Sequence, residues 1–149
     1  MRTSIDFVLN GQRRSLQGIP PELTVLRYLR ESEGLVGTKE GCAEGDCGAC
    51  TSVVAELAGE AISYRAVNTC IHFMGCLDGK ALITVEGLTS NGRDLHPVQR
   101  AMVAEHASQC GFCTPGFVMS LYAGRQNHVP PHRQDIDDLL AGNLCRCTG

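Results

Sequence analysis

Several features of familiar protein classes are absent from this sequence of 149 residues. No apolar run is long enough to span a bilayer, and residues 1–15 lack the apolar core of a secretory signal. The net charge of −3 supplies no basic surface for nucleic acid. The sequence therefore predicts a cytoplasmic protein that binds neither membranes nor nucleic acid.

Catalytic motifs are lacking as well. The serine, histidine and aspartate residues form no recognisable triad, no glycine motif for a phosphate group occurs, and the five histidines show no metal-type spacing. The length corresponds to one ordinary domain or two small ones. We therefore expect no catalytic residue and no substrate site, and a partner that is a protein or a bound inorganic cofactor.

Cysteine, in contrast, is abundant, because the chain contains nine. A reducing cytosol keeps thiols unpaired, which favours metal binding over disulfide formation. The cysteines form two separate groups, one in each half of a chain that changes character near Leu88.

The first half, residues 1–87, has the pattern of a small α+β unit. The dipeptide Asn10-Gly11 follows an alternating apolar segment and predicts a hairpin, and Thr24 can cap a short helix that ends at Gly34. Further strands are expected at residues 52–56, 64–67 and 81–85.

The second half, residues 88–149, has helical patterns throughout. A turn is expected at Asn91-Gly92, followed by helices that begin at Pro97, at Thr114 and near Arg133. The sequence predicts that Gly124 and the pair Pro130-Pro131 close the second of these helices.

The first cysteine group has the spacing of a plant-type [2Fe-2S] ferredoxin. Cys42, Cys47 and Cys50 follow a C-x4-C-x2-C pattern, and Cys70 comes later. The surrounding segment is rich in glycine, which lets backbone N–H groups approach an anionic cluster closely. Structural zinc is the alternative, although zinc sites usually combine two C-x2-C pairs.

The second cysteine group consists of two close pairs, Cys110 with Cys113 and Cys145 with Cys147. A threonine follows each pair, and a threonine N-cap would direct the positive end of a helix toward the cysteines. We therefore expect two helix N-termini to face one anionic cluster. Spacing alone leaves zinc as a rival at this site.

Three segments resemble the iron–sulfur part of the molybdenum hydroxylase (xanthine oxidase) family. They are Gly41-Cys-Ala-Glu-Gly-Asp-Cys-Gly-Ala-Cys50, Gln109-Cys-Gly-Phe-Cys-Thr-Pro-Gly116 and Gly142-Asn-Leu-Cys-Arg-Cys-Thr-Gly149. The resemblance covers essentially the whole chain, and the details are most similar to the small subunits of bacterial xanthine dehydrogenases.

The resemblance implies an α+β fold in which a β-grasp ferredoxin-like [2Fe-2S] domain, residues 1–87, precedes an all-α helical-bundle [2Fe-2S] domain, residues 88–149. It also implies an electron-transfer function. Electrons from purine hydroxylation at a molybdopterin centre would pass through the two clusters toward FAD and NAD. The molybdopterin-binding large subunit and an FAD-binding domain or subunit are the expected partners.

Carried over position by position, the resemblance assigns two sets of cluster ligands and two molybdopterin contacts. The contacts are Gln109 and Cys147, although Gln109 is equally typical of a helix C-terminus that bonds backbone carbonyls. Cys76 is left over and is expected to be a small buried hydrophobic residue, with a ligand or redox role, including ligation in place of Cys70, as the alternative. The ligand sets are Cys42, Cys47, Cys50 and Cys70 for one cluster, and Cys110, Cys113, Cys145 and Cys147 for the other.

Other functions have the same cysteine requirements. The chain could belong to an aldehyde or carbon monoxide oxidising relative, act as a free-standing electron carrier, or form a zinc-stabilised interaction module. Relatives in the family continue beyond the last motif with another helix, so we expect this chain to be truncated at its C-terminus and to hold its second cluster less stably than a longer version.

Overall fold

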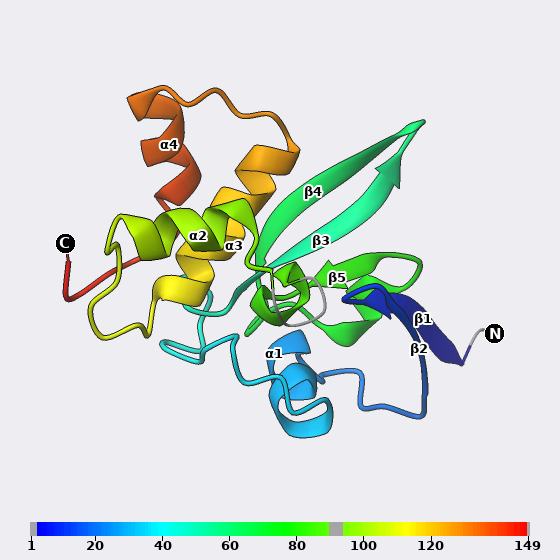
Figure 1. The fold of residues 1–149 in the computed structure, drawn as a ribbon. Helices are drawn as coiled ribbons and strands as arrows, with labels where there is room; N and C mark the ends of the chain where they lie inside the picture. Colours follow the sequence, from blue (N-terminus) through cyan, green and yellow to red (C-terminus); the bar gives the residue numbers. More distant parts are fainter. Residues whose placement is uncertain (1–2, 90–93, 149) are drawn as a thin grey trace.

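A five-stranded mixed sheet forms the centre of the protein, and helices cover both of its faces (Figure 1). The computed structural model describes residues 3–89 and 94–148. The strands lie in the order β2-β1-β5-β3-β4, with β1 and β5 parallel and the other neighbours antiparallel. Their bounds are β1 Ser4–Leu9, β2 Gln12–Gln17, β3 Thr51–Ala58, β4 Ala61–Asn68 and β5 Ala81–Ile83. The expected α+β class is confirmed.

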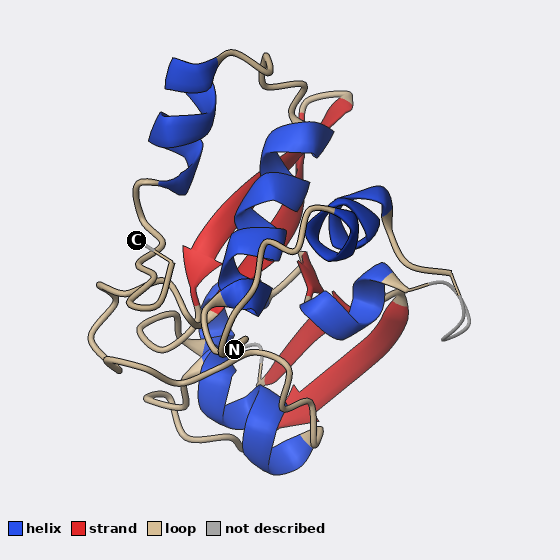
Figure 2. Ribbon diagram, turned by 60° about the vertical axis from the view of Figure 1, so that its left-hand side comes forward, coloured by secondary structure: helices blue, strands red, loops and turns tan. Residues whose placement is uncertain are grey.

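The helices are short, and the three longest follow the last strand (Figure 2). Among the described residues no helix is long and apolar enough to cross a membrane. The turn expected at Asn91-Gly92 lies outside the described residues. The α-helices are α1 Val25–Arg27, α2 Pro97–Ala104, α3 Thr114–Gln126 and α4 Arg133–Leu140; the π-helical turn η1 is Tyr28–Ser32, and the 3₁₀ turns are η2 Met74–Leu77 and η3 Val85–Leu88.

Two local predictions from the sequence are confirmed. Asn10 and Gly11 have φ angles of 48° and 82°, as a type I′ turn requires, and they join β1 to β2. Thr24 is the N-cap of α1, where its hydroxyl accepts a hydrogen bond from the Arg27 N–H at 3.3 Å.

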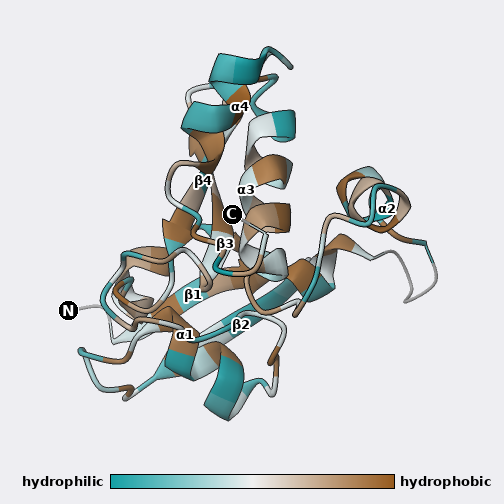
Figure 3. Ribbon diagram, turned by 90° about the vertical axis from the view of Figure 1, so that its left-hand side faces the viewer, coloured by the Kyte–Doolittle hydropathy of each residue, from teal (hydrophilic) through white to brown (hydrophobic). Residues whose placement is uncertain are grey.

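Strand β3 is buried on both faces, and this joins the two halves of the chain. On one face Val54 packs with α1 and η1 in a core that also contains Phe7 and Leu29. On the opposite face Val53 packs with α3, including Met119. Because alternate residues of a strand point to opposite faces, successive valines supply both cores. The second half therefore covers a face of the sheet built by the first (Figure 3).

Gly124 does not end the second long helix as the sequence predicted. It lies inside α3, which continues to Gln126, and a Cβ at this position would overlap the side chain of Leu139 from α4. The glycine therefore permits close packing of two helices, and this tertiary contact outweighs its poor helix propensity.

Asn127, the C-cap of α3, attaches that end of the helix to the sheet. Its side-chain amide donates to the Tyr64 carbonyl of β4 at 2.6 Å and accepts from the Tyr64 N–H at 3.3 Å. Tyr64 also makes an edge-to-face contact with Tyr122 of α3. The far end of α3, near the cysteines, has its own connection to the sheet, described below.

A partly buried ion pair connects β2 to the end of η1. The Arg14 guanidinium donates to both carboxylate oxygens of Glu33, at 2.8 and 3.0 Å, and the Tyr28 hydroxyl also donates to Glu33. The guanidinium is the main reason that the pKa of Glu33 lies below its usual range. Burial first, and then the neighbouring carboxylate, raises the pKa of Tyr28.

We expect Glu33→Gln to lower the melting temperature at pH 7 by a few degrees, because it removes one charged partner of this ion pair. Glu33 has a depressed pKa in the folded state, so its contribution is present above the unfolded pKa and is lost as the pH falls through the folded value. The difference from wild type should therefore shrink in thermal melts recorded below about pH 4.

Glu31→Gln is the matched control, since Glu31 forms an exposed pair with Arg27 on the same segment. Exposed ion pairs of this kind contribute little to the stability of the folded state. Equal melting temperatures for the two variants at pH 7 would contradict the assignment.

Candidate iron–sulfur sites

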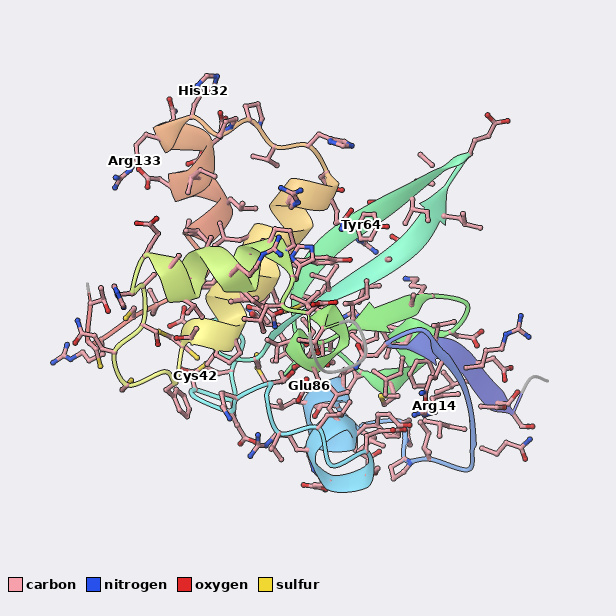
Figure 4. All side chains as sticks on the ribbon, in the orientation of Figure 1. Arg14, Cys42, Tyr64, Glu86, His132 and Arg133 are labelled. Carbon is pink, nitrogen blue, oxygen red and sulfur yellow. The ribbon has the colours of Figure 1, made fainter. Side chains whose placement is uncertain are left out.

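Three cysteines of the first group lie in the loop between η1 and β3, beside the first turn of α3 (Figure 4); they are Cys42, Cys47 and Cys50. Backbone N–H groups of this loop surround the Cys42 sulfur, with donors at Asp46 (3.4 Å) and Cys47 (3.3 Å). N–H groups of Glu44, Cys47 and Asp46 lower the pKa of the Cys42 thiol to about 7. The Glu44 and Asp46 side chains are exposed, so these residues contribute their backbones and not their carboxylates.

The fourth cysteine of this group, Cys70, follows the end of β4 and lies beside the loop. Cys70 lies within hydrogen-bonding reach of Cys50, and burial followed by this neighbour raises the pKa of Cys70 to about 11. Two adjacent residues hold the arrangement: the Thr69 hydroxyl donates to the Cys50 carbonyl at 2.7 Å, and the Asn68 amide donates to the Gly45 carbonyl at 2.6 Å. Cys42 and Cys47 form a second close pair in the same loop.

The second cysteine group surrounds a cavity of about 240 Å³ near the start of α3. Its wall includes Gln109, so the structure brings this glutamine to the same cavity as the cysteines. The apolar lining includes Phe117, Leu121 and Leu140, and the four cysteines in the wall are Cys110, Cys113, Cys145 and Cys147.

The thiols of this group are also arranged in two pairs. Cys113 neighbours Cys145, and Cys110 neighbours Cys147. Burial, and then Cys145, raises the pKa of Cys113 to about 11. The N–H and hydroxyl of Thr148 lower the pKa of Cys145 to about 6, and its N–H lies 3.3 Å from the sulfur.

Thr114 is not the N-cap that the sequence predicted. Cys113 occupies the N-cap position, and Thr114 is the first helical residue. The Thr114 hydroxyl is instead hydrogen-bonded to the Ser108 hydroxyl at 2.8 Å, which closes the loop between them. A helix does begin directly after Cys113, as expected, so one helix N-terminus lies at this site.

Both groups fit a two-iron cluster better than a single metal ion. Each supplies two pairs of thiols, which corresponds to two ligands for each iron of a [2Fe-2S] cluster. Across residues 3–89 and 94–148, no three His, Cys, Asp or Glu side chains converge on one point as a tetrahedral zinc site requires. All nine cysteines are free thiols, and Cys76 is exposed, so the expectation that it is a buried hydrophobic residue is wrong.

The two groups meet at Gly48, which lies between two cysteines of the first group. Its carbonyl accepts a hydrogen bond from the Asn143 side chain at 3.1 Å, and a Cβ on Gly116 of α3 would overlap the same carbonyl oxygen. A Cβ on Gly48 would in turn overlap the Gly142 carbonyl. Next to this contact the Leu144 N–H donates to the Cys47 carbonyl at 3.0 Å.

Sequence reasoning did not assign a role to the polar residues that support these loops. Asn143 and Ser120 form one buried hydrogen bond, and the Glu86 carboxylate accepts from the Gly37 N–H at 2.7 Å at the start of the first loop. The Gly142-Asn143 pair before the last two cysteines belongs to a motif quoted from the sequence, but the hydrogen-bond partner of Asn143 lies 95 residues away.

Comparison with known families divides the chain in the same way as the cysteines do. Residues 7–75 match the family model described as 2Fe-2S iron-sulfur cluster binding domain, and residues 84–149 match that of the [2Fe-2S] binding domain. Each matched range contains one group of four cysteines, and Cys76 lies just outside the first. The protein therefore contains two [2Fe-2S] domains.

Among solved structures, quinoline 2-oxidoreductase from Pseudomonas putida 86 is 34% identical and has a TM-score of 0.84, over 98% of this chain and 84% of that one. The chain belongs to the iron–sulfur components of the molybdenum hydroxylase family. The aldehyde oxidoreductase of Desulfovibrio desulfuricans, another member, has the same identity and TM-score, but the match covers only 15% of its chain.

Longer relatives in the family contain this unit as a small part. The chain is 49% identical over 144 residues to xanthine dehydrogenase of Oryza sativa subsp. japonica, a match that covers 95% of this chain and 10% of that protein. It is 45% identical over 145 residues to aldehyde oxidase 1 of Rattus norvegicus, covering 96% and 11% respectively. The chain thus spans about a tenth of the length of these curated relatives.

The contact at Gly48 predicts that adding a single methyl group there has an unusually large effect on the free energy of unfolding. Gly48→Ala should lower the free energy of unfolding by about 2–4 kcal/mol, because it combines a strained positive φ of 70° with the overlap on Gly142. Gly59→Ala is the matched control: its φ is 66°, but nothing lies within 4 Å, so about 1 kcal/mol is expected. Equal losses in urea denaturation of the two variants would contradict this interpretation.

Proposed function

We propose that this chain is the electron-transfer part of a xanthine dehydrogenase-type molybdenum hydroxylase and that it has no catalytic residue of its own. The observation that carries the proposal is the arrangement of eight cysteines as two pairs at each of two sites joined by a direct hydrogen bond. A [2Fe-2S] cluster, when bound, accepts and returns one electron. The protein's task is to hold two such clusters close together.

In this proposal the first cluster is held by Cys42, Cys47, Cys50 and Cys70, and the second by Cys110, Cys113, Cys145 and Cys147. Thiolates are the ligating form of cysteine, and backbone N–H groups favour that form at Cys42 and Cys145. The same N–H groups stabilise the negative charge of a bound cluster and help to set its potential.

We further propose that residues 1–87 form a β-grasp ferredoxin-like domain and residues 88–149 a helical-bundle domain. The first is supported by α1 packing across a sheet whose strands β1 and β5 are parallel. The second is supported by the sequence of helices α2, α3 and α4. Packing of α3 on β3 holds the two sites in a fixed relation.

The chain's own atoms provide a short connection between the sites. Cys47 of the first site and Cys145 of the second are linked through one hydrogen bond, from the Leu144 N–H to the Cys47 carbonyl. All other links in this path are covalent bonds of the two ligand residues and Leu144. With clusters bound at both sites, this path would offer electrons a route of covalent bonds and one hydrogen bond between them.

Gln109 and Cys147 are proposed to contact molybdopterin on a partner polypeptide or domain. Both are exposed and line the same cavity, so they are available to a partner surface. A molybdopterin-binding large subunit would then dock at the second site, and an FAD-binding domain or subunit at the first, with NAD as the final acceptor. We also propose a cytoplasmic location, because a reducing compartment keeps thiols available for metal binding.

Aldehyde oxidation is the second candidate for the complex as a whole. It is supported by the 45% identity to an aldehyde oxidase and by the fold shared with an aldehyde oxidoreductase. Purines and aldehydes would be distinguished by residues of the partner that binds the substrate, so the function of this chain is the same in both cases.

The proposal predicts iron and acid-labile sulfide in equal amounts in the chain purified without oxygen, and two distinct electron paramagnetic resonance signals after reduction with dithionite. Cys70→Ala should remove the signal of the first cluster, because it deletes one of four ligands. Cys76→Ala is the control and should keep both signals, since Cys76 is exposed and outside the proposed ligand sets.

Two results would contradict the proposal. Zinc without sulfide in the wild-type protein would exclude an electron-transfer function. Loss of the first cluster in Cys76→Ala but not in Cys70→Ala would show that the fourth ligand is assigned to the wrong cysteine.

A further inference from the structure

Asn143 is buried where the ligand-bearing segments of both sites meet. Only 8% of its surface is exposed, and it lies two residues before Cys145. Its side chain contacts Gly48, which lies between Cys47 and Cys50. It is therefore a buried side chain through which the second site contacts the first-site loop.

Both the nitrogen and the oxygen of the Asn143 side-chain amide form hydrogen bonds. Its nitrogen donates to the Gly48 carbonyl at 3.1 Å and to the Thr51 hydroxyl at 3.3 Å, and its oxygen accepts from the Ser120 hydroxyl at 2.6 Å. This set of partners requires a donor and an acceptor on one short side chain. A carboxylate at this position cannot donate to Gly48, and a hydroxyl is too short to reach both sides.

Three segments are thus fixed to one another: the first loop at Gly48, helix α3 at Ser120, and the loop that carries Cys145. The helix approaches so closely that only glycine fits at position 116. Immediately after Asn143, the Leu144 N–H reaches the Cys47 carbonyl. Without the Asn143 amide, that single backbone hydrogen bond would have to hold the two loops together.

We propose that Asn143 is a positioning residue that sets the separation of the two [2Fe-2S] clusters and thereby their electronic coupling. This inference rests on the ligand assignment of the proposed function. It assigns to Asn143 a role in communication between the clusters, which is distinct from holding either cluster in place.

The chain offers a matched control for this role. Asn127 also joins α3 to the sheet through a side-chain amide that both donates and accepts, but it does so at the end of the helix away from the cysteines. Asn143→Ala and Asn127→Ala therefore delete the same groups from two bridges between the same parts of the fold. Only the first deletion affects the cluster junction.

The test is low-temperature electron paramagnetic resonance of the fully reduced chain, combined with iron and sulfide analysis. Two reduced clusters held close together split each other's signals, and the splitting falls steeply with their separation. Asn143→Ala is expected to retain both clusters but to lose the splitting or reduce it clearly. Asn127→Ala should have the wild-type splitting, even if its melting temperature is lower.

Ser120→Ala provides a second measurement if Asn143→Ala does not assemble both clusters. This variant keeps Asn143 but leaves its amide oxygen without the hydroxyl partner, so a smaller reduction in the splitting is expected. Wild-type splitting in Asn143→Ala would overturn the inference. If Asn143→Ala does not assemble both clusters, wild-type splitting in Ser120→Ala would overturn it. A reduction of the splitting in Asn127→Ala equal to that in Asn143→Ala would also overturn it. Absence of iron and sulfide from the wild-type chain would instead refute the proposed function.

Discussion

The structure depends on one close approach of main chains, at the carbonyl of Gly48. Glycine at positions 48 and 116 removes the side chains that would keep the first cysteine loop, α3 and the second cysteine loop apart. The carbonyl at this contact accepts hydrogen bonds from the Asn143 amide and from the N–H and hydroxyl of Thr51. Buried backbone groups need such partners, so the close packing of the three segments is accompanied by these hydrogen bonds. Both candidate cluster sites take their relative position from this junction.

The second constraint is the double burial of β3. A strand with one solvated face would allow the helical half to move relative to the sheet, whereas Val53 and Val54 place apolar surface in two separate cores. The strand begins at Thr51, directly after Cys50, so its rigidity extends to the first cysteine loop. At the other end of the interface, Asn127 and Tyr64 prevent α3 from pivoting. The two sites are therefore held on one rigid framework.

Sequence reasoning recovers the parts of this arrangement that are local. The hairpin at Asn10-Gly11 and the cap at Thr24 follow from the backbone chemistry of single residues, and cysteine spacing separates the two candidate sites. The role of Gly124 was predicted wrongly, because a glycine that ends a helix and one that admits a neighbouring side chain have the same local signal. The bond between Asn143 and Gly48 joins residues 95 apart, and no periodicity in the sequence reports it.

The exposure of the individual cysteines distinguishes the side of the two sites that faces solvent from the side where the sites face each other. At the first site Cys50 is buried, and at the second Cys110 and Cys147 are exposed. Cys145 lies between them, because its neighbour Leu144 bonds to the first site and its sulfur pairs with Cys113 at the second. Electron exchange with a partner needs an exposed edge, whereas exchange within the chain needs a buried one. In the proposed function, the exposed pair Cys110 and Cys147 would meet the first requirement, and the junction at Gly48 would meet the second.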